Sequence, residues 1–155
     1  MCIRDSNGSF ERSSSPLPAE WSTYLPDQVQ VAVDRTSAHT GLASVRLSAS
    51  KGGPSGWPSL RTPVVQALVP GNPYTVTAWA RGAASTGTNR VSITWYDARG
   101  AYLGATSSTN VPAGTTGWQP LTAAGVAPPN TAAAFVQLQT TRNAGAVWFD
   151  DVTFG

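Results

Sequence analysis

The sequence is short of the side chains on which catalysis usually depends. Charged residues make up 12% of its 155 residues, against about 25% in an average protein, and it contains one histidine, one cysteine and two glutamates. Acid–base and nucleophilic catalysis need titratable groups that converge in space. His39 lies in the turn-like segment AHTG, and Cys2 lies near the N-terminus without an evident partner. We therefore expect that the protein is not an enzyme.

Other absences narrow the possible partners. A single cysteine excludes an internal disulfide, and no apolar run approaches the roughly 18 residues of a membrane-spanning helix. The net charge is only +2, with one lysine and with arginines that are scattered along the chain. The sequence therefore lacks the basic patches that bind nucleic acid or membrane surfaces, and we expect neither as a partner.

The first six residues, MCIRDS, differ in character from the rest of the chain. They resemble a non-native leader found on sequences assembled from environmental DNA. We expect residues 1–6 to be such a leader and residues 7–155 to form a single domain. No internal repeat and no long linker divides this second part.

Strand patterns cover most of the remaining sequence. Apolar and polar residues alternate in six segments, and turn-forming sequences such as HTG, VPGNP and DARG separate them. The 15 glycines and 12 prolines interrupt any helix of normal length. We therefore predict an all-β fold, a two-sheet antiparallel β-sandwich of the jelly-roll type. The six segments are 28–33, 43–50, 74–81, 90–97, 134–141 and 146–154.

The alternation also assigns side chains to faces. In three of these segments the residues of one parity are mainly apolar and suit a core, whereas the other parity carries one aromatic among Thr, Ser, Gln and Arg. Aromatic rings with polar neighbours can stack on flat apolar surfaces and hydrogen-bond around their edges. We predict that the polar parity lines one concave binding face. The predicted face consists of Trp79, Arg81, Tyr96 and Gln137, with Trp57 and Gln139 at its margins.

The order of the sequence motifs is similar to that of a known group of domains. The motifs are NGSFE (7–11), Trp21, DRTSAHTGLASVRLS (34–48), VPGNPYTVTAWARG (69–82), ITWYDARGAYLG (93–104), Trp118 and WFDDVTF (148–154). In this order and spacing they resemble the jelly-roll carbohydrate-binding modules of families 4, 9 and 22. The resemblance covers essentially all of the sequence after residue 6.

The resemblance implies a structural Ca²⁺ that ties the first strand to the last. Glu11 matches the glutamate of the family's first motif, and Asp150 matches the first aspartate of its terminal DDV. Ca²⁺ binds several oxygens, in which carboxylates are supplemented by backbone carbonyls. Ser9 and Thr40, the latter in the turn SAHTG, are the further expected ligands, and Asp151 is expected to be a turn or salt-bridge residue. The alternative is that Glu11 and the two aspartates are ordinary carboxylates at a sheet edge.

The resemblance also implies a function. Such modules are noncatalytic and bind plant or microbial polysaccharides such as β-glucan or xylan, and they tether an attached glycoside hydrolase or surface protein. Trp57 resembles the tryptophan that family 22 modules use for sugar stacking. Xylan-binding members carry an acidic residue on the late strand, where this sequence has Gln137 and Gln139. We expect an extracellular, secreted protein, with covalently linked catalytic or surface domains in the full-length chain.

Two alternatives stay open from the sequence. A structural or adhesive sandwich of a surface or phage-tail protein would show the same strand pattern without sugar affinity. A glycoside-acting enzyme would need two carboxylates about 5 to 9.5 Å apart, and the predicted binding face supplies no such pair. An open groove with exposed aromatics favours the binding module, whereas a flat face with buried aromatics favours the structural domain.

Overall fold

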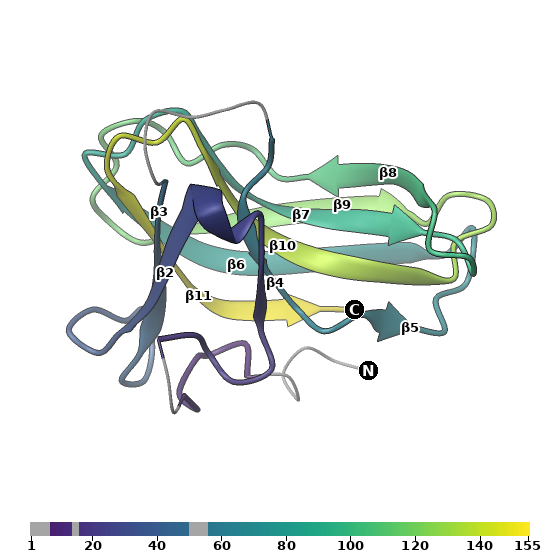
Figure 1. Cartoon of the computed structure of the whole chain (residues 1–155), viewed down its shortest axis with the longest axis horizontal. Helices are drawn as coiled ribbons and strands as arrows, with labels where there is room; N and C mark the ends of the chain where they lie inside the picture. Colours follow the sequence, from purple (N-terminus) through teal and green to yellow (C-terminus); the bar gives the residue numbers. More distant parts are fainter. Residues whose placement is uncertain (1–6, 14–15, 50–55) are drawn as a thin grey trace.

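The computed structural model describes residues 7–13, 16–49 and 56–155 (Figure 1). The predicted leader, residues 1–6, lies outside the described residues. Within the described part, the structure consists of strands and one 3₁₀ turn, η2 (Pro26–Gln28). The prediction of an all-β, two-sheet antiparallel sandwich is therefore confirmed.

One sheet has six strands, with the order β1-β4-β10-β7-β8 and with β5 also paired to β10. All of its pairs are antiparallel. Its strands are β1 (Ser22–Tyr24), β4 (Ser59–Arg61), β5 (Val65–Gln66), β7 (Thr88–Tyr96), β8 (Tyr102–Ser107) and β10 (Ala133–Thr141).

The second sheet has five antiparallel strands in the order β2-β3-β11-β6-β9. The first and last strands in sequence thus belong to different sheets, and β11 lies at the centre of its own. The strands are β2 (Val29–Asp34), β3 (Ser44–Ala49), β6 (Pro73–Ala83), β9 (Gln119–Val126) and β11 (Ala146–Phe154).

All six strands predicted from alternation are present, and their parity matches the core. Burial alternates along β6, whose Val76, Ala78 and Ala80 are fully buried between the sheets. The same holds for the apolar parity of β7 and β10, for example Trp95 and Leu138. A half-buried sheet surface favours this alternation because successive side chains point to opposite faces.

Strand β9 shows why some strands lack a clear alternation of apolar and polar residues in the sequence. Its sequence, QPLTAAGV, contains a proline and a glycine, which are both unfavourable inside a sheet. The strand is nevertheless formed because β9 is at the edge of its sheet and pairs only with β6, so that Pro120 need not donate to a second neighbour.

The predicted single binding face is wrong in one respect. Trp79 and Arg81 lie on β6, in the five-stranded sheet, whereas Tyr96 and Gln137 lie on β7 and β10, in the six-stranded sheet. Each residue does point away from the core, but the outer faces of the two sheets are on opposite sides of the sandwich. Parity gives the face of a strand, and it does not say to which sheet the strand belongs.

No helix in the described ranges is both long and apolar enough to cross a membrane.

The core beneath β10 should dominate stability. Leu138 is fully buried on β10, so Leu138→Ala should lower the free energy of unfolding by about 2–5 kcal/mol through lost burial and the cavity left behind. Val126→Ala, at a side chain that is 60% exposed at the end of β9, should change it by less than about 0.5 kcal/mol. Urea denaturation measures both. Equal effects would contradict the assignment of the core.

Candidate functional site

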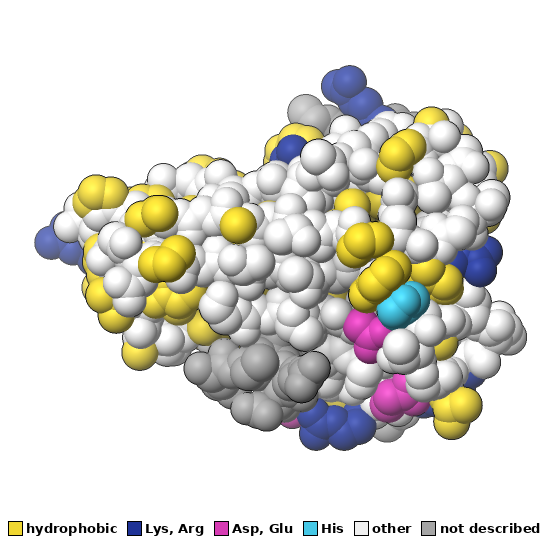
Figure 2. All heavy atoms as spheres, turned by 180° about the vertical axis from the view of Figure 1, so that it is seen from behind, with side chains coloured by type: hydrophobic (Ala, Val, Ile, Leu, Met, Phe, Trp, Pro, Cys, Tyr) yellow, Lys and Arg dark blue, Asp and Glu magenta, His cyan; other side chains and the backbone are white. Residues whose placement is uncertain are grey.

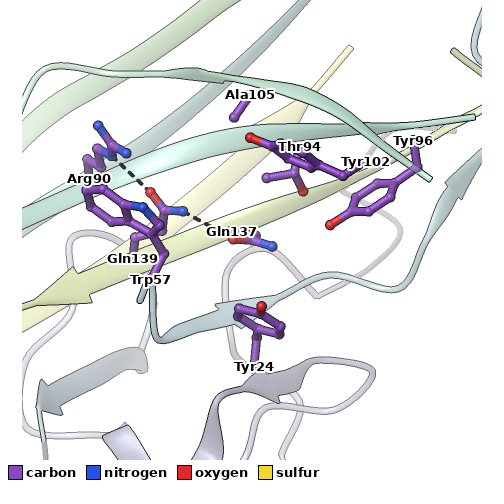
Figure 3. A pocket seen from close by; sticks show the side chains of 9 residues that line it. All are labelled: Tyr24, Trp57, Arg90, Thr94, Tyr96, Tyr102, Ala105, Gln137 and Gln139. Atoms are coloured by element: carbon purple, nitrogen blue, oxygen red, sulfur yellow. Dashed lines mark hydrogen bonds between the residues drawn. The ribbon is translucent and has the colours of Figure 1, made fainter. Parts of the chain in front are cut away.

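A hollow of about 410 Å³ lies on the outer face of the six-stranded sheet (Figure 3). Four aromatic side chains, one arginine and two glutamines surround it, together with two smaller residues. Strands β1, β7, β8 and β10 and the segment before β4 contribute side chains. The lining residues are Tyr24, Trp57, Arg90, Thr94, Tyr96, Tyr102, Ala105, Gln137 and Gln139.

Strand register places these side chains in rows. Gln139 of β10 is paired with Arg90 of β7, and Gln137 is flanked by Ser92 and Arg61. Residues directly opposite each other on paired strands point to the same face. Two further rows continue along the hollow, one through Phe135, Thr94 and Ala105, and one through Tyr96 and Tyr102. The strand rows therefore place the arginine and the glutamines toward one end of the hollow and Tyr96 and Tyr102 toward the other.

The aromatic side chains are unusually open. Tyr24 and Trp57 are each 41% exposed and Tyr102 is 61% exposed, so three of the large exposed apolar side chains of the described residues gather at one hollow. Tyr96 contacts Tyr102 edge to face, with ring centroids 5.9 Å apart. Exposed aromatics that cluster beside polar groups indicate a binding surface.

A chain of hydrogen bonds forms the polar floor of the hollow. Arg90 Nε donates to Gln139 Oε1 (2.9 Å), and Gln139 Nε2 donates to Gln137 Oε1 (3.2 Å). Ser59 Oγ lies at 3.4 Å from the same Gln137 oxygen. Both glutamines are at most 4% exposed, and the Arg90 guanidinium lies 4.0 Å above the Trp57 ring. These contacts hold the floor in one arrangement.

Four of the six predicted binding residues meet in this hollow, namely Trp57, Tyr96, Gln137 and Gln139. The other two, Trp79 and Arg81, do not. Arg81 donates to Ser37 Oγ (3.0 Å) and stacks over Trp148 on the five-stranded sheet. It is therefore engaged in a local contact on the opposite side of the sandwich.

Five lining residues were missed from the sequence: the small Thr94 and Ala105, and the larger Arg90, Tyr102 and Tyr24. Arg90 has the same parity as Tyr96 on β7 and was therefore detectable, although it stands at the start of the predicted strand. Tyr102 follows a hairpin turn and lies outside the six segments of alternation. Tyr24 lies on the three-residue strand β1, which is too short to give an alternation signal.

A larger hollow, of about 710 Å³, lies on the five-stranded sheet and is more polar. Its one aromatic residue, Trp79, is stacked with the His39 imidazole at 3.9 Å, with 12° between the rings, and Trp118 contacts the histidine edge-on. Figure 2 shows the histidine beside acidic and apolar side chains on this side of the molecule. Because His39 covers one face of Trp79, this hollow offers less ring surface. It is lined by Gly8, Ser9, Thr40, Thr77, Trp79, Asp151, Val152 and Thr153.

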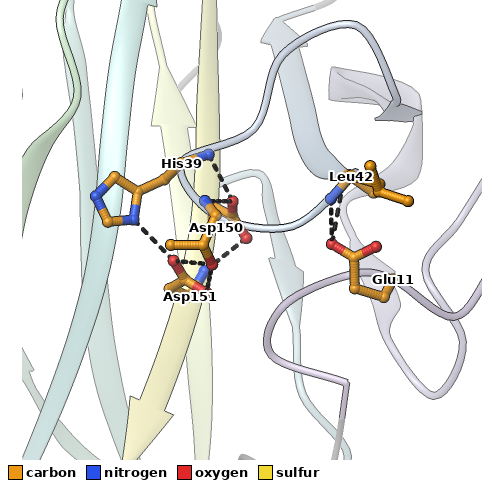
Figure 4. Close-up of polar contacts among 7 residues, drawn as sticks. Glu11, His39, Leu42, Asp150 and Asp151 are labelled. Carbon is orange, nitrogen blue, oxygen red and sulfur yellow. Dashed lines mark hydrogen bonds and ion pairs between the residues drawn. The ribbon is translucent and has the colours of Figure 1, made fainter.

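Two carboxylates hold the turn that contains residues 39–43 (Figure 4). Asp150 Oδ2 accepts from the amides of His39 (2.8 Å) and Thr40 (3.2 Å). Glu11 Oε1 accepts from the amides of Leu42 (2.8 Å) and Ala43 (3.1 Å). The N-terminal segment and the last strand are thereby joined through one turn.

The two aspartates that interrupt the last strand have different roles. Their register with β6 is broken between Asp150 and Thr153, and Asp151 has a positive φ of 48°, which indicates a β-bulge. Asp150 points inward and is fully buried, and burial raises its pKa to about 6. Asp151 instead contacts His39 Nδ1 (2.7 Å), which is an ion pair when the histidine is protonated, and accepts from Thr40 Oγ1.

The expected calcium ligands are close to this turn. Glu11 and Asp150 bracket it, and Ser9 and Thr40 line the adjoining hollow together with Asp151. Among the described residues no group of three or more Asp, Glu, His or Cys side chains converges. The donor set therefore fits a calcium site only if carbonyls, hydroxyls and water complete it, as they do in many such sites.

Several solved structures share this fold. The C-terminal family 22 carbohydrate-binding module of Clostridium thermocellum Xyn10B is 20% identical, with a TM-score of 0.66 over 97% of this chain and 94% of that one. A cyclase from Fischerella sp. is 18% identical, with a TM-score of 0.73 over 99% and 95%. The enzymatically active domain of tailspike protein 4 from bacteriophage CBA120 is 18% identical (TM-score 0.72), and the match covers 96% of this chain but only 20% of that protein.

At these identities the structural similarities establish the fold and not a shared activity. No curated protein sequence matches the chain significantly. The family described as "Carbohydrate binding domain" matches residues 6–144, which is most of the chain. The chain therefore belongs to this family of carbohydrate-binding domains, as its sequence motifs indicated.

Proposed function

We propose that this carbohydrate-binding module binds a polysaccharide such as β-glucan or xylan through the hollow on the six-stranded sheet. The observation that carries the proposal is the joining of exposed aromatics, Trp57, Tyr24 and Tyr102, to a fixed polar floor. Sugar rings have apolar C–H faces that stack on aromatic rings and hydroxyl edges that hydrogen-bond. The hollow is open and its aromatics are exposed, which favours a binding module over a purely structural sandwich.

We also propose that the module is noncatalytic. None of the nine residues lining the hollow is Asp or Glu, and glycoside hydrolysis ordinarily needs two carboxylates there. His39, the single histidine, is engaged by Asp151 and by the Trp79 ring on the other sheet. The Fischerella cyclases and the tailspike domain show that this fold also occurs in enzymes. Their activities belong to those proteins.

We propose that the module acts as a tether that holds an attached domain at its polysaccharide. One solved relative is a xylanase in which a family 22 module is part of the same chain as a GH10 module. We propose that this domain is likewise linked to a catalytic or surface domain in a secreted protein. Binding of the module to the polymer raises the local concentration of its attached partner without any new chemistry.

Calcium is the proposed cofactor, with Glu11 and Asp150 as carboxylate ligands and Ser9 and Thr40 as further oxygen donors. Support comes from Asp150, which is fully buried and has no cationic partner among the described residues, so that only backbone amides compensate for its charge. A buried carboxylate is costly unless a cation or several hydrogen bonds compensate for it. A divalent cation would link the N-terminal segment to β11 and add to the amide contacts of the 39–43 turn.

Trp57 should be required for glycan binding, whereas Trp79 should not. Trp57→Ala removes a stacking surface and should weaken binding to the retained polysaccharide by about tenfold or more, with the same melting temperature. Trp79→Ala is the matched control because it changes a tryptophan on the opposite sheet. Affinity electrophoresis on xylan, β-glucan, mannan and pectin gels measures both. If only Trp79→Ala abolished retention, the glycan would bind on the five-stranded sheet and the proposed site would be wrong.

Calcium should stabilise the fold. Saturation at 100 times the dissociation constant adds about 2.7 kcal/mol, which corresponds to about 5–10 °C in the melting temperature of a domain of this size. Melting in EDTA and in excess Ca²⁺ tests this. Glu11→Ala should abolish the shift, and Glu20→Ala, which removes an exposed contact with Arg12 at 3.8 Å, should retain it. Equal midpoints in EDTA and Ca²⁺ for the unmodified protein would show that no site exists.

Calcium binding should also weaken on acidification, and this loss should begin at a higher pH than for a site with an ordinary aspartate. Protons compete with the metal for Asp150, whose pKa is raised to about 6 in the metal-free protein by burial. Affinity should therefore fall about tenfold per pH unit below pH 6, rather than below about pH 4 as for an ordinary aspartate. Calorimetric titration between about pH 4.5 and 7.5 measures this. A constant affinity between pH 6 and about pH 5 would contradict Asp150 as a ligand.

A further inference from the structure

The polar floor of the hollow has a defined direction of hydrogen bonding. Arginine has no acceptor atom, so the contact between Arg90 Nε and Gln139 must end on the amide oxygen of Gln139. The Gln139 nitrogen then faces Gln137, whose oxygen must accept. An unambiguous donor at one end therefore fixes the orientation of both amides.

The floor of the hollow therefore presents hydrogen-bond donors to a ligand. The Gln137 oxygen is already used by Gln139 and lies close to Ser59 Oγ, while the Gln137 nitrogen has no hydrogen-bond partner among the described residues. Figure 3 shows this nitrogen turned away from Gln139. The terminal nitrogens of Arg90 are likewise free of carboxylates in the described ranges.

The charge in the lining of the hollow has one sign. Arg90 and Arg61 belong to the strand rows that cross the face, and none of the residues lining the hollow is acidic. Arg61 lies 4.4 Å above the Phe135 ring, and its buried Nε has no partner among the described residues. Burial lowers the pKa of the Arg90 guanidinium from its ordinary value. A partly desolvated cation without a counter-ion is relieved by an anionic ligand.

Resting on the proposed function, we infer that the hollow is built for an acidic glycan, in which Arg90 holds a uronate carboxylate, the Gln137 amide donates to a sugar hydroxyl, and Trp57 or a tyrosine stacks on a sugar ring. A guanidinium matches a carboxylate with two parallel hydrogen bonds. Neutral sugar hydroxyls can accept from the same donors, but they gain no charge-assisted bond. The chemical class recognised is therefore a carboxylate-bearing polysaccharide.

The test uses matched pairs of oligosaccharides that differ only in the carboxyl group. Glucuronic-acid-bearing xylo-oligosaccharide and oligogalacturonate are each compared with their carboxyl-reduced forms by calorimetric titration in about 20 mM salt. In at least one pair the acid should bind about tenfold or more tightly than its reduced form. This preference should shrink in about 0.5 M NaCl, because exposed charge interactions are screened.

Substitutions identify which residue is responsible for the preference for the acid over its reduced form. Arg90→Met should remove it, and Arg90→Lys should restore part of it because the charge is kept while the fork is lost. Arg81→Met is the matched control, since Arg81 also stacks over a tryptophan, Trp148, but on the other sheet. It should leave the preference unchanged. Circular dichroism and melting confirm that each variant is folded.

The outcomes distinguish the ligand class from the function itself. If reduced or neutral oligosaccharides bind as tightly as the acids, or if Arg90→Met keeps the preference, the acidic-glycan inference is wrong while the polysaccharide-binding function stands. If the acids, their reduced forms and neutral β-glucan and xylan oligosaccharides all fail to bind, the proposed function is wrong and the inference falls with it.

Discussion

Strand β10 pairs with β7 along one edge and with β4 along the other, and the floor of the hollow depends on that register. The pairing sets Gln139 beside Arg90 and sets Gln137 between Ser92 and Arg61. Because the side chains of a strand alternate, the same strand buries Val136 and Leu138 completely in the core. A slip of one residue would move the glutamines into the core, so packing of the apolar parity fixes the position of the binding groups.

The two outer faces of the sandwich differ in what they carry. The six-stranded sheet carries the exposed aromatics and the hydrogen-bonded arginine–glutamine chain. The five-stranded sheet carries the turn of residues 39–43, which Glu11 and Asp150 hold from two ends of the sequence. Gly41 lies in that turn with a φ of +66°, and a Cβ there would overlap the Glu11 carboxylate. A side chain at position 41 would therefore be strained at this φ and would displace the Glu11 carboxylate from the turn.

The sequence predicted more of the fold than of the site. Period-two alternation identified the long strands and the buried parity, since both follow from local chemistry. It placed Gln137 and Gln139 on an outer face correctly. It could not show that β6 belongs to a different sheet from β7 and β10, because sheet membership depends on pairing between strands distant in sequence. Trp79 and Arg81 were assigned to the wrong face for that reason.

Two aromatic lining residues lie on or beside elements that are too short for alternation to reveal them. Tyr24 lies on a strand of three residues, and Trp57 shortly precedes another of the same length, β4. Such segments have no period to detect, and only their pairing to β10 through β4 brings them to the hollow. The motif order indicated Trp57 by family resemblance, whereas nothing comparable indicated Tyr24. Arg90 had the correct parity, but its importance depends on the hydrogen bond to Gln139, which is a property of the folded sheet.

Glycan binding on the six-stranded sheet is the central claim. An amide and indole ¹H–¹⁵N titration with glucuronic-acid-bearing xylo-oligosaccharide measures it directly, because each residue reports separately. We predict shifts at the Trp57 indole, the Arg90 side chain and the side-chain amides of Gln137 and Gln139, with the Trp79 and Trp118 indoles unchanged. Shifts confined to Trp79, Trp118 and the residues around Asp151 would contradict the claim.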